Sequence, residues 1–159
     1  MNRKQTVQWG ILGCARIAAT ALIPGIKGSV NGEVLAVASR NLEKAKEYGR
    51  RFDIPRSYGS YEELLDDPEI QAVCVPLPNS LHKEWTIKAA EKGKHVLCEK
   101  PIACCTADAQ EMSDACRTNG VLLMEAFAQR FHPQYQRVEE LIRIGLLTFS
   151  SCSGGYSNL

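Results

Sequence analysis

A glycine-containing segment near the N-terminus has the composition of a loop that binds phosphate groups. Glycines let the backbone turn tightly and approach a pyrophosphate, while a helix N-terminus offers free N–H groups and a positive dipole end. Alanine stands in the third position of the glycine pattern, so an ordinary strand-to-helix turn is the alternative. The place of the segment between the first strand and the first helix favours nucleotide binding. The residues that we assign to this loop are Gly10, Gly13, Cys14, Ala15, Arg16 and Ile17.

The end of the next apolar run distinguishes between the two nicotinamide dinucleotides. An acidic residue at this point would hydrogen-bond the ribose hydroxyls of NAD. The sequence has Ser39 and Arg40 instead. A guanidinium is a planar, permanently charged group suited to a phosphate, and a serine adds a hydroxyl donor. The pair therefore favours NADP(H), with NAD(H) as the second choice. The alternative is that Arg40 is a solvated residue at the start of a helix.

Short apolar runs and amphipathic stretches alternate along the chain and must position these residues. Six runs of strand length alternate with helical stretches, which predicts an α/β fold with a doubly wound parallel sheet, the Rossmann dinucleotide-binding fold. We expect this single domain to cover residues 1–145. The expected strands are Thr6–Leu12, Val34–Ser39, Arg56–Tyr58, Ala72–Val75, His95–Cys98 and Val121–Met124. The expected helices are Ala15–Lys27, Leu42–Phe52, Tyr61–Asp66, Leu81–Lys92, Thr106–Thr118 and Pro133–Ile144.

Composition excludes several classes of protein. The net charge of +1 gives no electrostatic reason to expect nucleic acid or a membrane surface as a partner. Seven cysteines, an odd number without a C-x-x-C pair, are expected to be free thiols in a reducing compartment. The three histidines are scattered, so we predict no metal site. The N-terminus lacks a signal-peptide pattern and the apolar stretches are short, so a cytoplasmic location is expected.

The last residues differ from the rest of the chain. Residues 146–159 begin like a strand and continue in Ser, Gly and Asn. We interpret this segment as the start of a second domain that is truncated or missing. Its strand-like part, residues 146–150, is expected to leave an unpaired edge in the isolated chain.

Five motifs in order resemble those of the Gfo/Idh/MocA oxidoreductases, a family that includes glucose–fructose oxidoreductase and inositol dehydrogenase. The resemblance covers roughly residues 6–150 and is greatest to the NADP-dependent sugar and dihydrodiol dehydrogenases. The motifs are GILGCARIA at 10–18, AVASR at 36–40, PLPNSLH at 76–82, CEKP at 98–101, and EAF at 125–127 with RFHP at 130–133.

The resemblance implies hydride transfer between NADP(H) and a sugar, polyol or diol, with Lys100 as the catalytic lysine. A lysine beside the nicotinamide can exchange a proton with a substrate hydroxyl and stabilise negative charge on oxygen. It also implies a cis Lys100–Pro101 peptide bond. By the same resemblance, further residues line the cofactor or the active-site region: Pro76, Leu77, Asn79, His82, Glu99 and Arg130. His82 as a packing residue at a helix start, Arg130 in an ion pair and His132 in a structural role are the alternatives.

The resemblance also implies a part that this sequence does not contain. Members of the family carry a second α/β domain that supplies most of the substrate pocket and the surface for homo-oligomers. We therefore expect the 159-residue chain to bind NADP(H) but to turn over little or nothing. The alternative function is a non-catalytic nucleotide-binding module that acts alone or through a partner chain.

Overall fold

A computed structural model describes residues 6–146 of the chain, which divide into two compact units between Ala126 and Phe127. The first unit contains a six-stranded sheet in the order β3-β2-β1-β4-β5-β6. All neighbouring strands pair in parallel. This is the predicted Rossmann fold. The strands are β1 (Val7–Leu12), β2 (Gly32–Ala38), β3 (Arg56–Tyr58), β4 (Ala72–Val75), β5 (His95–Cys98) and β6 (Leu123–Glu125).

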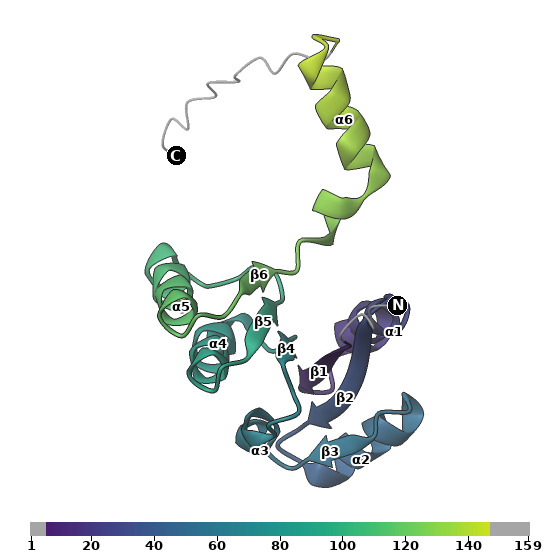
Figure 1. Ribbon diagram of the computed structural model, residues 1–159, viewed down its shortest axis with the longest axis vertical. Helices are drawn as coiled ribbons and strands as arrows, with labels where there is room; N and C mark the ends of the chain where they lie inside the picture. The colour runs from purple at the N-terminus through teal and green to yellow at the C-terminus, as the bar shows by residue number, and fades with distance from the viewer. Residues whose placement is uncertain (1–5, 147–159) are drawn as a thin grey trace, which may run out of the picture. The chain divides into compact units, whose positions relative to one another are not determined.

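Helices cover both faces of this sheet, with α1 and α2 on one side and α3, α4 and α5 on the other (Figure 1). Apolar residues therefore occupy both faces of the central strands, as the uninterrupted apolar runs predicted. Leu12 and Val73 pack on the side of α3 and α4, while their neighbours Ile11 and Cys74 pack on the side of α1 and α2. The helices are α1 (Ile23–Lys27), α2 (Leu42–Arg51), α3 (Tyr61–Asp66), α4 (His82–Glu91) and α5 (Thr106–Thr118).

The first helical segment differs in detail from the prediction. A π-helical turn, η1 (Ala18–Leu22), leads directly into α1, and Pro24 lies in the first turn of α1. Proline has no backbone N–H to continue the hydrogen bonds of the preceding turn, and the helix type changes next to it. The expected interruption near Pro24 is thus a change of helix type rather than a break.

The sixth strand begins later than the apolar sequence predicted. Val121 and Leu122 precede β6, and Leu122 is 73% exposed. Pairing with β5 sets the register, since Val96 faces Leu123 and Cys98 faces Glu125. A polar residue, Glu125, is consequently the last residue of the strand.

The second unit holds a 3-10 helix, η3 (Ala128–Phe131), and a helix, α6 (Pro133–Arg143). His132 caps α6, because its Nδ1 accepts a hydrogen bond of 3.2 Å from the amide of Gln134. The expected domain boundary near residue 145 stays a prediction. The strand expected at 146–150 falls almost entirely outside the described residues.

Candidate nucleotide site at the carboxyl edge of the sheet

Because all six strands are parallel, the segments that follow them meet at one edge of the sheet. The strand order reverses between β1 and β4, and this is where open α/β sheets bind ligands. The predicted site residues of the first unit follow β1, β2, β4 and β5 at this edge. The exceptions are Gly10, which lies inside β1, and His82, which is the first residue of α4.

Gly13 fits the part of a phosphate-loop glycine. Its φ of 99° is one that other residues rarely adopt. Its amide donates a 2.8 Å hydrogen bond to the carbonyl of Ala38 at the end of β2. A Cβ at this position would lie 3.0 Å from Cδ2 of Leu77. The loop therefore needs glycine for its conformation and for its approach to the segment after β4.

Gly10 has a different surrounding from the one expected of a loop glycine. It is buried within β1, and a Cβ there would lie 2.6 Å from Cδ2 of Leu64 and 3.3 Å from Cδ1 of Ile70. Its missing side chain makes room for α3 to pack on the sheet. The structure gives Gly10 a packing role within β1, and its contact with the cofactor stays a prediction.

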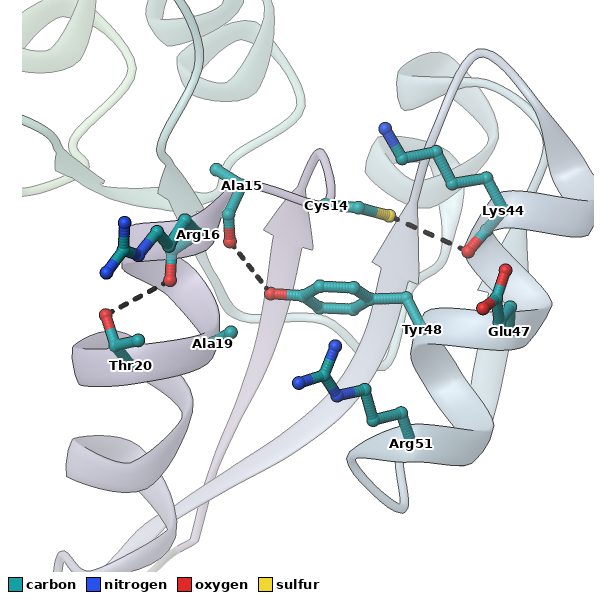
Figure 2. A pocket seen from close by; sticks show the side chains of 9 residues that line it. All are labelled: Cys14, Ala15, Arg16, Ala19, Thr20, Lys44, Glu47, Tyr48 and Arg51. Carbon is teal, nitrogen blue, oxygen red and sulfur yellow. Dashed lines mark hydrogen bonds between the residues drawn. The ribbon is translucent and has the colours of Figure 1, made fainter.

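A hollow of about 520 Å³ lies beside the loop, between η1 and α2. Figure 2 shows Tyr48 reaching from α2 across this hollow, where its hydroxyl donates a 3.0 Å hydrogen bond to the carbonyl of Ala15. The thiol of Cys14 lies 3.9 Å from the carbonyl of Lys44, also on α2. Two contacts thus connect α2 to the glycine loop. Arg16 lines the hollow, and Arg16 and Ile17 are exposed.

Two groups at the hollow ionise less readily than usual. Burial raises the pKa of Cys14, although Lys44 and a hydrogen bond with Ser39 oppose the shift. Burial, with a smaller contribution from Cys14, also raises the pKa of Tyr48 to about 12. Both groups are therefore neutral at physiological pH, and Tyr48 keeps the proton that it donates to Ala15.

The end of β2 presents polar and basic groups together. Ser39 is buried, and its hydroxyl accepts a 3.3 Å hydrogen bond from the amide of Asn41. Asn41 caps α2 by accepting a 3.1 Å hydrogen bond from the amide of Lys44. Arg40 and Lys44 are both exposed, and neither forms a salt bridge within the described part of the chain. This end of the sheet thus offers a hydroxyl and two cations.

The segment after β4 combines buried and exposed predicted residues. Pro76 is buried, Leu77 is half-buried against Gly13, and Asn79 is exposed in a short 3-10 helix, η2 (Asn79–Leu81). His82 begins α4 and its side chain is fully buried. Its Nε2 lies 2.8 Å from the carbonyl oxygen of Leu77, and its Nδ1 lies 3.0 Å from that of Pro101.

The turn after β5 carries the predicted catalytic lysine. Lys100 is exposed, and its bond to Pro101 is cis, as predicted. The carboxylate of Glu99 accepts a 3.2 Å hydrogen bond from the amide of Lys100. Glu125, at the end of β6, accepts a 2.8 Å hydrogen bond from the amide of Ile102. Both carboxylates are thus used in part to fix the turn.

Arg130 is the predicted site residue that belongs to the second unit. It is exposed in η3 of the second unit, and its amide donates a 3.1 Å hydrogen bond to the carbonyl of Phe127.

Within residues 6–146, no helix is both long and apolar enough to cross a membrane. The same part of the chain holds no cluster of three or more His, Cys, Asp or Glu side chains suited to a metal ion.

Three residues at this edge were missed by reasoning from the sequence. Tyr48 and Lys44 belong to a helix whose charged residues predicted only a solvated face. Glu125 follows an apolar run that predicted a strand ending one residue earlier. The one signal available was the EAF motif, which contains Glu125 without indicating its contact to Ile102.

Comparison with known proteins defines the class. Residues 7–127 match the Gfo/Idh/MocA family, described as an oxidoreductase family with an NAD-binding Rossmann fold. The match covers most of the chain, and the protein therefore belongs to this family.

Individual relatives are considerably longer than this chain. A D-xylose 1-dehydrogenase (NADP(+)) from Haloferax volcanii is 42% identical over 95% of this chain and 46% of its own length. A trans-1,2-dihydrobenzene-1,2-diol dehydrogenase from Xenopus laevis is 40% identical over 85% of this chain and 41% of its own length. The crystal structure of a 3-ketoreductase from Actinomadura kijaniata with NADP and TDP-benzene superposes with a TM-score of 0.85 at 36% identity, covering 90% of this chain and 44% of that one. The chain thus spans less than half the length of these relatives.

Proposed function

We propose that this chain is the NADP(H)-binding part of an oxidoreductase that acts on a sugar, polyol or diol. The observation that carries the choice of cofactor is the group at the end of β2. Ser39 and Arg40 stand where an acidic residue would select NAD, and the exposed Lys44 adds a second cation. Relatives support this choice, because one is named for NADP(+) and the ketoreductase crystal contains NADP.

The carboxyl edge fits a dinucleotide in its donor chemistry. The loop at Gly13 would hold the pyrophosphate, because the residues after Gly13 lead into a helical segment without a side-chain cap, and Gly13 has no Cβ to obstruct a close approach. Ser39, Arg40 and Lys44 would bind the 2′-phosphate. The second mononucleotide would lie past the switch point, over the segments that follow β4 and β5.

Lys100 is proposed as the group that handles the substrate proton. Bound NADP(H) supplies the hydride-transfer chemistry. During oxidation of an alcohol, Lys100 would accept the hydroxyl proton, and during reduction it would return a proton to the carbonyl oxygen. Glu99 and Glu125 would keep the lysine in place by fixing the turn on both sides of it.

Calorimetric titration with NADPH and NADH tests the choice of cofactor. Arg40→Ala should weaken NADPH binding about ten- to hundredfold and leave NADH binding nearly unchanged, because a charge-assisted contact to the 2′-phosphate contributes roughly 1.5–3 kcal/mol. Arg50→Ala is the matched control, since it removes the same charge from the far end of α2. Equal losses for both cofactors, or tighter binding of NADH by the unaltered chain, would contradict the assignment.

Formation of NADPH in the presence of pentoses, hexoses, inositols and diols tests the role of Lys100. The purified 159-residue chain should show low turnover at most, since hydride transfer requires a substrate carbon held about 3–3.5 Å from the nicotinamide. Any turnover should disappear in Lys100→Ala while NADPH binding persists. Robust turnover that survives this substitution would remove the lysine from the mechanism. Binding without turnover for every substrate, also in a chain extended to the length of the relatives, would favour the non-catalytic alternative.

A further inference from the structure

His82 has an unusual environment for a residue that could bind cofactor directly. Its side chain is fully buried, so it has no surface to offer a ligand. Each ring nitrogen already lies within hydrogen-bond distance of a backbone carbonyl, 2.8 Å from Leu77 and 3.0 Å from Pro101. The ring thus contacts two separate segments that both belong to the candidate site.

We propose that His82 is a positioning residue whose ring connects the segment after β4 to the Lys100–Pro101 turn after β5 through hydrogen bonds. The inference rests on the proposed function, in which these two segments bind the nicotinamide half of the cofactor. A neutral imidazole donates from one nitrogen only, whereas an imidazolium donates from both. In every protonation state the ring donates to at least one of the two carbonyls, so at least one segment is hydrogen-bonded to α4.

The position of the ring makes this contact consequential for binding. Leu77, whose carbonyl it meets, is also the residue that packs on the glycine loop at Gly13. Pro101 follows Lys100 directly, and the next amide, of Ile102, is held by Glu125 on the other side. Loss of the ring would take the donor from at least one of these carbonyls and loosen the connection between the two segments, and NADPH would then have to order them on binding.

Hydrogen exchange of the cofactor-free chain tests the fastening without reference to the proposed function. His82→Phe keeps a ring and removes both contacts. Exchange should accelerate in peptides covering residues 76–82 and 99–103 and stay unchanged in peptides from β1 and β2. Unchanged exchange in both regions would overturn the proposal, and so would acceleration throughout the chain, which indicates a general loss of stability.

Titration with two ligands tests the consequence for the cofactor. NADPH spans both halves of the site, whereas 2′,5′-ADP contains only the adenosine half. His82→Phe should raise the Kd of NADPH about tenfold and leave that of 2′,5′-ADP within about twofold. Equal losses for the two ligands would overturn the positioning role. If the unaltered chain binds neither ligand, the proposed function fails, while the exchange experiment still decides on the fastening.

Two conservative variants separate the two contacts. The amide nitrogen of Asn approximates Nδ1, and that of Gln approximates Nε2, so His82→Asn keeps a donor toward Pro101 and His82→Gln keeps one toward Leu77. Each variant should protect from exchange the segment that it still contacts and lose less NADPH affinity than His82→Phe. Identical behaviour of all three variants would contradict a role for the individual hydrogen bonds.

Discussion

The two glycines of the GILG motif should respond differently to the same substitution. Gly10→Ala adds a Cβ 2.6 Å from a methyl group of the fully buried Leu64. Overpacking of this kind lowers the free energy of unfolding by about 1–3 kcal/mol. Gly13→Ala instead forces a Cβ onto a backbone with φ of 99°, which costs about 1–3 kcal/mol of local strain.

Stability alone therefore does not separate the two variants, but cofactor affinity does. Once folded, Gly10→Ala should bind NADPH as the unaltered chain does, because its clash lies on the α3 side of β1. Gly13→Ala should bind NADPH markedly less well, because the strain lies in the loop that would receive the pyrophosphate. Gly120→Ala is the matched control for strain, since Gly120 also has a positive φ of 67° but no neighbour within 4 Å of an added Cβ.

The packing explanation for Gly10 is tested by a double-mutant cycle. Leu64→Ala alone should cost about 2–5 kcal/mol in urea unfolding without cofactor. Leu64→Ala also removes the methyl groups that the new Cβ meets, so the double variant should be more stable than the sum of the single losses predicts, by about 1–3 kcal/mol. Strictly additive losses, or a fall in NADPH affinity for Gly10→Ala equal to that for Gly13→Ala, would refute the division of roles.

Two further predictions concern contacts away from the cofactor. Tyr48→Phe removes the hydrogen bond to Ala15 and should cost about 0.5–1.5 kcal/mol of stability; calorimetry should show NADPH and NADH weakened by a similar factor, and a loss confined to NADPH would contradict this. Burial raises the pKa of Asp67, but hydrogen bonds from Arg56, the Glu69 amide and Tyr58 outweigh it and lower the net pKa. The ionised carboxylate thus contributes stability above its unfolded pKa of about 3.9, and this stability is lost as pH falls through the lower folded value. Urea unfolding between about pH 5 and 2 should show a shallower decline for Asp67→Asn, and an unchanged slope would exclude the contribution.

The sheet could be predicted from sequence because both faces of its strands are buried. Runs such as 34–39 and 72–75 are apolar without alternation, and that pattern occurs in parallel sheets covered by helices on both sides. The ends of the strands are harder to predict from the sequence, since Val121 and Leu122 are as apolar as the strand that follows them. Pairing between Val96 and Leu123 decides where β6 begins, and no local property of the sequence contains that register.

The candidate site was predictable where a residue acts through its own backbone or charge. Gly13 needs its conformation locally, and Arg40 carries its charge wherever its neighbours lie. Gly10 was interpreted as a loop glycine because its spacing fits the pattern, although its role depends on Leu64, far along the chain. His82 was similarly placed at the cofactor by resemblance, whereas its burial and its two carbonyl contacts became visible only in the structure.

Three side chains that hold the loops at the carboxyl edge come from elements elsewhere in the chain. Tyr48 of α2 holds the glycine loop at Ala15, and His82 and Glu125 hold the turn after β5. A substitution outside these loops can therefore change the geometry of the site while the loop sequences stay the same, because the residues that fix the loops lie elsewhere in the chain. The two fastenings also act on different halves of the edge. A substitution at Tyr48 should for this reason disturb the end proposed to bind phosphate. A substitution at His82 should disturb the end that carries Lys100. Neither needs a change in the residues that would touch the cofactor.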